Sequence, residues 1–106
     1  MIATSRPLTI TPDAERFLRE RKAQDALGLL ADLTSRVFPD ALRMSADLHE
    51  DPDVADARWV LIRVVVPWTD GERARQARDQ WYAHTGDVCS PGVLANFGLE
   101  IDRRPG

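Results

Sequence analysis

The sequence predicts a small α+β protein with the element order α–β–β–α–β. This order folds as a two-layer sandwich, in which two helices cover one face of a small, mainly antiparallel sheet. Three observations predict the class: a long apolar stripe at helical spacing, two adjoining segments of alternating polarity after it, and a shorter helical segment followed by a last alternating segment. Each element has an apolar face, and stacking helices on a sheet buries these faces together.

The length of 106 residues fits a single domain over residues 1–106. We expect residues 1–10 to form a loose N-terminal arm and residues 103–106 to form a tail. The composition, 43% hydrophobic and 29% charged, is that of an ordinary globular protein. A folded core is therefore expected rather than disorder.

The first helix is expected from Pro12 to Val37. Thr11 can cap its N-terminus, proline is tolerated at the first helical position, and Pro39 ends the element. Gly28 weakens the middle, because glycine costs about 1 kcal/mol relative to alanine inside a helix. The apolar stripe consists of Ala14, Phe17, Leu18, Ala23, Ala26, Leu27, Leu30, Leu33 and Val37.

Two strands are expected after this helix, over residues 41–50 and 58–68. The first alternates in polarity, with Leu42, Met44, Ala46 and Leu48 on its inward side. The second is rich in β-branched residues and is apolar on both faces, which is usual for a strand in the middle of a sheet. Because the two strands are neighbours in sequence, we expect them to pair antiparallel. The second strand has one face formed by Val60, Ile62, Val64 and Val66, and another formed by Trp59, Leu61, Arg63 and Val65.

The second helix is expected to begin at a capping box formed by Thr69 and Glu72. It is expected to end near His84, with Gly86 as its stop. Its apolar stripe is thin, and Trp81 is expected to anchor it to the sheet.

The last strand is expected over residues 96–101, after a short turn capped by Ser90. A right-handed crossover would place it parallel to the strand at 58–68 in the same sheet. Its inward side chains are expected to be Phe97, Leu99 and Ile101.

An acidic segment with one histidine connects the two central strands. It and the end of the first strand contain Asp47, His49, Glu50, Asp51, Asp53 and Asp56. With His84, these side chains are the basis of an alternative function, a small metal-assisted or acid–base enzyme. Their spacing matches no calcium loop, and a structural zinc site would need four ligands from a chain with one cysteine and two histidines. Aspartate and Asp-Pro are turn formers, so we favour a charged turn and assign no catalytic, cofactor-binding or metal-binding residue.

Cys89 is the single cysteine, which excludes an internal disulfide and agrees with a reducing compartment. It would be a nucleophile only if His49, His84 or a carboxylate reached it, and a small buried hydrophobe is its more common role. The sequence contains no phosphate loop and no GxSxG or HExxH motif.

Three arginines, Arg73, Arg75 and Arg78, fall in the second expected helix. They are the basis of a third hypothesis, the binding of phosphate or nucleic acid. A formal net charge of −3 argues against nucleic acid, and a solvated helix face is the alternative interpretation.

Trp59, Leu61 and Val65 are the candidate interface residues. If both helices cover the opposite face of the strand, these three side chains point outward. An exposed apolar stripe that contains tryptophan is typical of a protein–protein interface. The alternative is that a helix or the N-terminal segment 7–10 covers the stripe within the same chain.

The segment "DLHEDPDVADARWVLIRVVV", the capped helix containing Trp81 and the segment "NFGLEI" resemble a group of small uncharacterised bacterial α+β proteins. These proteins have an acidic EDP turn between two strands, then an amphipathic helix with a tryptophan. They are often standalone genes in toxin–antitoxin-like or accessory neighbourhoods. The resemblance implies no activity, cofactor or site residue for this chain.

We therefore expect a non-enzymatic protein–protein interaction module of the bacterial cytoplasm, which forms a homodimer or binds a small protein partner through its sheet face. An antitoxin-like, immunity-like or accessory-subunit role fits the size and mild acidity. Only Lys22 among the 14 basic residues is a lysine, and this bias suggests a GC-rich bacterial genome. No apolar run reaches membrane-spanning length and the N-terminus lacks a signal-peptide pattern, so we expect no membrane partner and no secretion, and we expect no cofactor.

Overall fold

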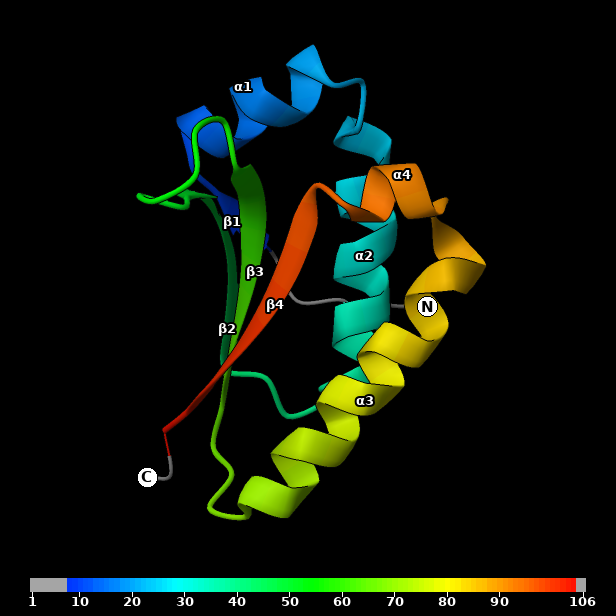
Figure 1. Cartoon of the computed structure of the whole chain (residues 1–106). Helices are drawn as coiled ribbons and strands as arrows, with labels where there is room; N and C mark the ends of the chain where they lie inside the picture. Colours follow the sequence, from blue (N-terminus) through cyan, green and yellow to red (C-terminus); the bar gives the residue numbers. More distant parts are fainter. Residues whose placement is uncertain (1–7, 105–106) are drawn as a thin grey trace.

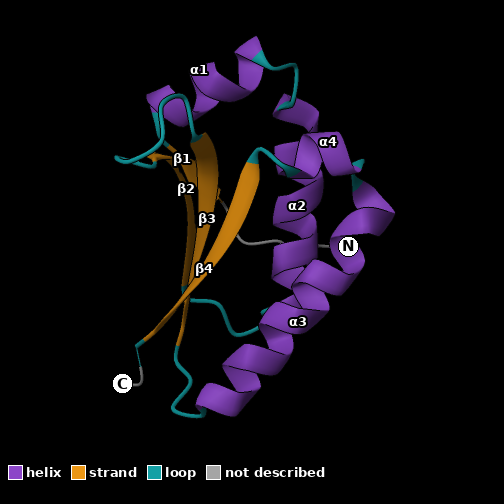
Figure 2. Ribbon diagram, in the orientation of Figure 1, coloured by secondary structure: helices purple, strands orange, loops and turns teal. Residues whose placement is uncertain are grey.

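The computed structural model describes residues 8–104, which form a four-stranded sheet with helices on one side (Figure 1). In chain order the elements are β1 (Leu8–Ile10), α1 (Pro12–Glu20), α2 (Gln24–Val37), β2 (Arg43–Glu50), β3 (Arg58–Val66), α3 (Gly71–Val88), α4 (Pro91–Leu94) and β4 (Phe97–Arg103). The two layers are clear in Figure 2, and the expected α+β class is confirmed.

The strands follow the order β1-β2-β3-β4 across one sheet. β2 and β3 pair antiparallel, whereas β1 pairs parallel to β2 and β4 pairs parallel to β3. The expected central hairpin and the expected parallel placement of the last strand are both confirmed, and the sheet as a whole is mixed. β3 is an inner strand, and its inward residues Val60, Ile62, Val64 and Val66 are fully buried.

The N-terminal arm expected at residues 1–10 differs in the structure, because residues 8–10 form the edge strand β1. Leu8 and Ile10 are half-buried and pack against the core. The backbone N–H of Thr11 donates to Ala46 O at 3.1 Å, which continues the pairing with β2. Residues 1–7 lie outside the described part of the chain.

The tail expected at residues 103–106 also begins later than the sequence suggests. Arg103 is the last residue of β4, and the backbone N–H of Arg104 donates to Val66 O at 2.8 Å. The first two residues of the expected tail therefore pair with the sheet, and residues 105–106 lie outside the described residues.

The single helix expected from Pro12 to Val37 is in fact two helices, α1 and α2, with a tight turn between them. Lys22 has a φ of 56°, in the left-handed region that ends many helices. The N–H of Lys22 donates to Arg19 O at 3.1 Å and that of Ala23 to Leu18 O at 2.8 Å, the paired bonds of a Schellman motif. The apolar stripe hides this break, because the buried Ala23 continues the stripe across it.

The N-terminal cap of α1 agrees with the sequence prediction, and that of α3 differs from it. Thr11 caps α1 as expected, with Oγ1 accepting a backbone N–H at 3.3 Å. For α3 the capping residue is Asp70 and not Thr69, since Asp70 Oδ1 accepts the N–H of Glu72 at 2.9 Å. Gly86 does not stop α3, because glycine costs only about 1 kcal/mol inside a helix that tertiary packing supports.

The α2 and α3 helices pack against each other over the sheet (Figure 1). Trp81 of α3 is 1% exposed, and its Nε1 donates to Thr34 Oγ1 of α2 at 2.9 Å. The same cluster contains Ile62 and Val64 of β3. Trp81 is therefore the anchor that the sequence predicts.

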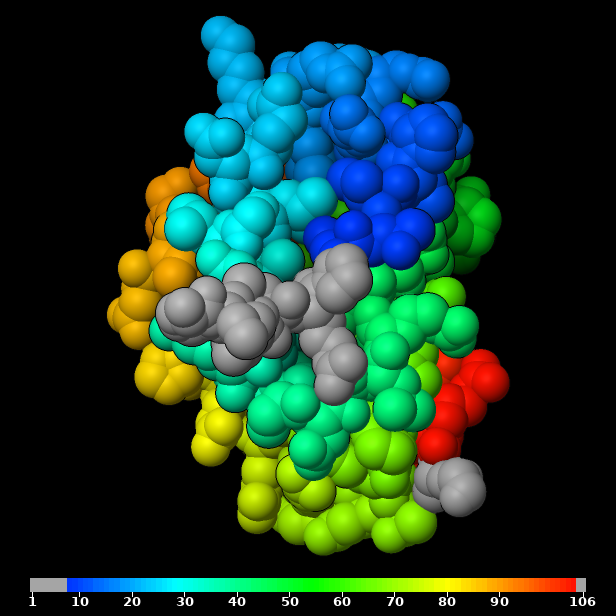
Figure 3. Space-filling model, turned by 180° about the vertical axis from the view of Figure 1, so that it is seen from behind, coloured from blue at the N-terminus to red at the C-terminus, as the bar shows by residue number. Residues whose placement is uncertain are grey.

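The α1 helix covers one end of the same sheet face. Phe17 and Leu18 form a second cluster with Ala46 and Val60. Seen from behind, the blue and cyan residues of β1, α1 and α2 make up much of the molecular surface (Figure 3).

Leu42 differs from its expected inward position and is 57% exposed, since β2 begins only at Arg43.

Candidate functional site

The outer face of the sheet, meaning the side away from the helices, is the candidate site. In residues 8–104 the helices pack on the inner side, and the outer side is left open (Figures 1 and 2). The strand register arranges its side chains in rows across the strands. The rows are His49–Trp59, Asp47–Leu61–Gly98, Ser45–Arg63–Glu100 and Arg43–Val65–Asp102.

Trp59, Leu61 and Gly98 form an apolar surface that we call the outer patch. Trp59 and Leu61 are half-buried, and both lie against Gly98 of the neighbouring strand. A Cβ at Gly98 would lie 3.4 Å from Trp59 Cδ1 and 3.5 Å from Leu61 Cδ1. The indole also stacks on the His49 ring, with 6.3 Å between ring centroids. The absence of a side chain at Gly98 thus lets two apolar side chains lie across β4.

Val65 shares this face but adds little to its exposed surface. It lies in the row with Arg43 and Asp102 and is 5% exposed. Of the three candidate interface residues, Trp59 and Leu61 therefore present partly exposed apolar surface, and Val65 is buried.

A charged row runs beside the outer patch. Arg63 donates a hydrogen bond to Glu100, and its Nη1 lies 3.8 Å from Asp47 Oδ2. The hydrogen bond to Glu100 and the charges of Glu100 and Asp47 raise the pKa of Arg63 above its usual value. Because these side chains are partly solvent-exposed, we expect the ion pairs to contribute little to the stability of the fold, and their main effect is on the charge pattern of the outer face.

A second ion pair lies at the end of the same face. Arg104 Nε donates to Asp102 Oδ1 at 3.0 Å, and this bond lowers the pKa of the Asp102 carboxyl. Asp102 lies beside Val65 in the register, so the apolar side chain is bordered by charge.

The acidic connection between β2 and β3 is a charged turn. Asp51 Oδ1 accepts the backbone N–H of Asp53 at 2.9 Å, and the N–H of Asp51 donates to Ala57 O at 2.8 Å. Asp56 has a φ of 63°, a conformation that aspartate tolerates better than most residues. These contacts are the turn chemistry that the sequence predicts.

The residues of the enzyme alternative lie on different sides of the protein. Asp47 and His49 lie on the outer sheet face, whereas His84 lies on α3, where its Nδ1 is 3.2 Å from Asp87 Oδ2. Within residues 8–104, no group of three or more histidine, cysteine or acidic side chains is arranged to hold a metal ion.

Cys89 lies at the C-terminal cap of α3 and packs against the main core cluster. Burial raises the pKa of its thiol, which lowers the thiolate fraction near neutral pH. Among residues 8–104, His84 pairs with Asp87, and burial is the cause that shifts the pKa of the thiol.

The three arginines of α3 do not share one patch. Arg73 pairs with Asp40 at 2.8 Å and lies over the Trp68 ring, 4.0 Å from its centroid. Arg75 and Arg78 instead line a groove beside β4. The division follows from the helical twist, which turns residues 73 and 75 about 200° apart.

The sequence could not identify Leu61 and Arg63 as the neighbours of Gly98 and Glu100 on the outer face. Their places opposite Leu61 and Arg63 depend on the parallel register of β4, which alternation alone does not specify. The alternating inward positions of β4 were the only signal available, and they imply that the residues between them face outward.

Comparison of the chain with protein-family models, with curated proteins and with solved structures finds no match. Within residues 8–104, none of the helices combines the length and the apolar character that crossing a bilayer requires.

Proposed function

We propose that this chain is a non-enzymatic interaction module that forms a homodimer through the outer face of its sheet. The observation that supports this proposal is the outer patch, in which Trp59 and Leu61 stay partly exposed on a face that the described helices leave open. A tryptophan-containing apolar centre with a charged border is the usual anatomy of a protein interface.

The charges of the face favour a second copy of the chain as the occupant. Arg63 lies between Asp47 and Glu100, and Arg104 lies beside Asp102, so both signs occur on the same face. In a two-fold symmetric interface each copy presents the same surface. A surface that carries both signs can then place opposite charges across the symmetry axis.

The proposed setting is the bacterial cytoplasm. The bias toward arginine and the free thiol of Cys89 support it. An antitoxin-like, immunity-like or accessory-subunit role would use the same outer face for a second protein.

Size-exclusion chromatography with light scattering tests the proposal. Trp59→Thr and Leu61→Lys remove the outer patch with residues that a strand accepts at solvent-facing positions. Leu29→Lys makes the same apolar-to-charged change at a 46% exposed position on α2 and is the matched control. We expect dimers for the wild type and for Leu29→Lys, and monomers for the two patch variants.

Thermal unfolding of each variant separates loss of the interface from loss of the fold. The patch variants should retain a cooperative transition as monomers. A wild type that is monomeric at its highest attainable concentration would overturn the proposal, as would dimers that persist in both patch variants.

A further inference from the structure

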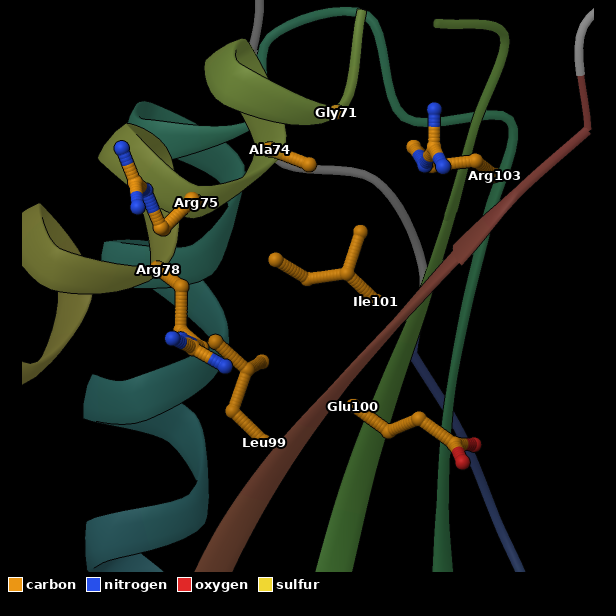
Figure 4. A pocket seen from close by; sticks show the side chains of 8 residues that line it. All are labelled: Gly71, Ala74, Arg75, Arg78, Leu99, Glu100, Ile101 and Arg103. Carbon is orange, nitrogen blue, oxygen red and sulfur yellow. The ribbon is translucent and has the colours of Figure 1, made fainter. Parts of the chain in front are cut away.

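A groove between α3 and β4 lies apart from the outer patch (Figure 4). It has a volume of about 410 Å³. Leu99 and Ile101 project from β4 toward the helix and form its apolar floor, while Arg75 and Arg78 form its wall on α3. Arg103 closes one end, where its Nη1 donates to the backbone O of Thr69 at 2.8 Å, so the groove combines an apolar floor with basic walls.

The floor of this groove is the open edge of the sheet. β4 is the last strand in the order, and it pairs only with β3 among the described residues. The N–H of Val60 donates to Asn96 O and the N–H of Arg104 donates to Val66 O, both at 2.8 Å. Backbone groups alternate in direction along a strand, so the N–H and C=O groups of the even-numbered residues of β4 point toward β3.

The odd-numbered residues of β4 therefore turn their backbone N–H and C=O groups away from the sheet. Leu99 and Ile101 offer these groups at the groove, and no other residue in 8–104 bonds to them. An unpaired edge of this kind is a template for one more strand. β4 has 7 residues, so it can pair with an extended segment of similar length.

The charge of the groove indicates which side chains an added strand should have. Arg75 pairs with Glu72 on its own helix, while Arg78 has no ion pair or hydrogen bond with another residue in 8–104. Glu100 also lines the groove, but its side chain points to the opposite side of the strand and binds Arg63 (Figure 4). The groove therefore carries a net positive charge from Arg78, which attracts carboxylates.

We infer that this groove binds an extended acidic segment of another protein, which adds a fifth strand to the sheet at β4. The backbone of the segment pairs with Leu99 and Ile101, and its carboxylates face Arg75 and Arg78. This inference does not depend on the homodimer proposed above, because the edge of a sheet stays accessible when its outer face is covered.

A second copy of this chain is a poor occupant of the groove. Antiparallel pairing of β4 with its own symmetry mate would bring Arg75 and Arg78 of both copies to the same side of the joined sheet. Like charges placed together disfavour that arrangement, whereas an acidic strand neutralises them.

Fluorescence anisotropy with a labelled peptide of about eight residues tests the inference. The probe alternates glutamate with valine, so that one of its faces carries carboxylates and the other is apolar. We expect saturable binding that weakens steeply with added salt. The same peptide with lysine in place of glutamate should bind at least about tenfold more weakly, and so should the glutamate peptide with N-methylated alternate amides.

Variants of the protein identify the groove. Arg78→Glu should weaken binding of the glutamate peptide at least about tenfold and Arg78→Gln by less, because reversal of a charge adds repulsion to the lost attraction. Arg16→Glu, at an exposed position on α1, makes the same charge change outside the groove and should leave the affinity unchanged. Trp59→Thr should leave it unchanged as well, which keeps this result separate from the homodimer.

Amide hydrogen exchange gives a readout that charge attraction alone would not move. In the free protein the amides of Leu99 and Ile101 should exchange fast, and peptide binding should protect them. The amide of Glu100 already faces β3 and should change little. Equal affinity for the acidic and basic peptides, unchanged affinity in Arg78→Glu, or unprotected Leu99 and Ile101 amides at saturation would each overturn the inference.

Discussion

The indole Nε1 of Trp81 on α3 donates a hydrogen bond of 2.9 Å to the hydroxyl oxygen of Thr34 on α2, and both side chains are buried. The hydroxyl of Thr34 in turn donates to Leu30 O at 2.6 Å. One threonine thus satisfies the only polar side-chain atom of the buried Trp81, and it joins the two helices that cover the sheet.

Thr34→Val should destabilise the protein by about 1–3 kcal/mol, because it leaves the buried Trp81 donor without an acceptor. Thr34→Ser keeps the hydroxyl and should cost less. Urea unfolding monitored by circular dichroism measures both variants. In a double-mutant cycle with Trp81→Phe, the two changes should be coupled. Equal losses for the valine and serine variants would show that the hydrogen bond contributes little.

Lys22→Gly should stabilise the protein by about 1 kcal/mol. Lys22 is held at a φ of 56° at the end of α1, and glycine adopts this conformation without the steric cost that a Cβ brings. Lys22→Ala removes the charge but keeps the Cβ, so it is the control and should give no such gain. The midpoint of urea unfolding compares the two, and a similar shift in both would point to the lysine charge instead of the backbone.

Gly98→Ala should fold with the outer patch intact and gain up to about 0.5–1 kcal/mol, because glycine weakens a strand relative to alanine. A methyl group 3.4 Å from Trp59 Cδ1 is an ordinary contact. Gly98→Ile should instead displace Trp59, since a branched side chain cannot occupy the space under the indole. The Nε1–H NMR signal of Trp59 reports this displacement. If the signal moves equally in both variants, the indole does not rest on Gly98 as described.

Cys89 should react slowly with iodoacetamide at pH 7 compared with free cysteine. Burial raises its pKa, and the thiolate is the species that reacts. The alkylation rate should rise with pH and reach its plateau at a higher pH than that of the free amino acid. Mass spectrometry of quenched samples gives the rate. Reaction at neutral pH as fast as that of free cysteine would mean that the thiol is accessible and activated.

Local pattern predicts most of the elements, and tertiary packing explains the differences. The alternation around Met44 and Ile62 indicates strands, and the spacing around Leu30 indicates a helix, because each pattern has the period of one element. The break at Lys22 follows from a backbone conformation that apolar spacing does not encode. β1 escapes prediction because a three-residue strand has too short a pattern to recognise.

The sequence likewise predicts one part of the candidate site and not the rest. The sequence places Trp59 and Leu61 on one face of a strand, because side chains alternate along an extended backbone. It could not show that Gly98 lies beneath them, or that Arg78 faces the open edge of β4, because these relations join residues about 40 and 20 positions apart through the strand register and the packing of α3.

The pattern of residues along the chain is enough to predict the fold class, the inward face of the central strand and the turn chemistry of the acidic loop, since each depends on residues that are neighbours in the sequence. The packing of residues 8–104 is needed to show which face of the sheet stays open, which side chains border that face and which strand edge is unpaired. Those features depend on how separate elements pack, and this packing brings together residues that lie far apart in the sequence.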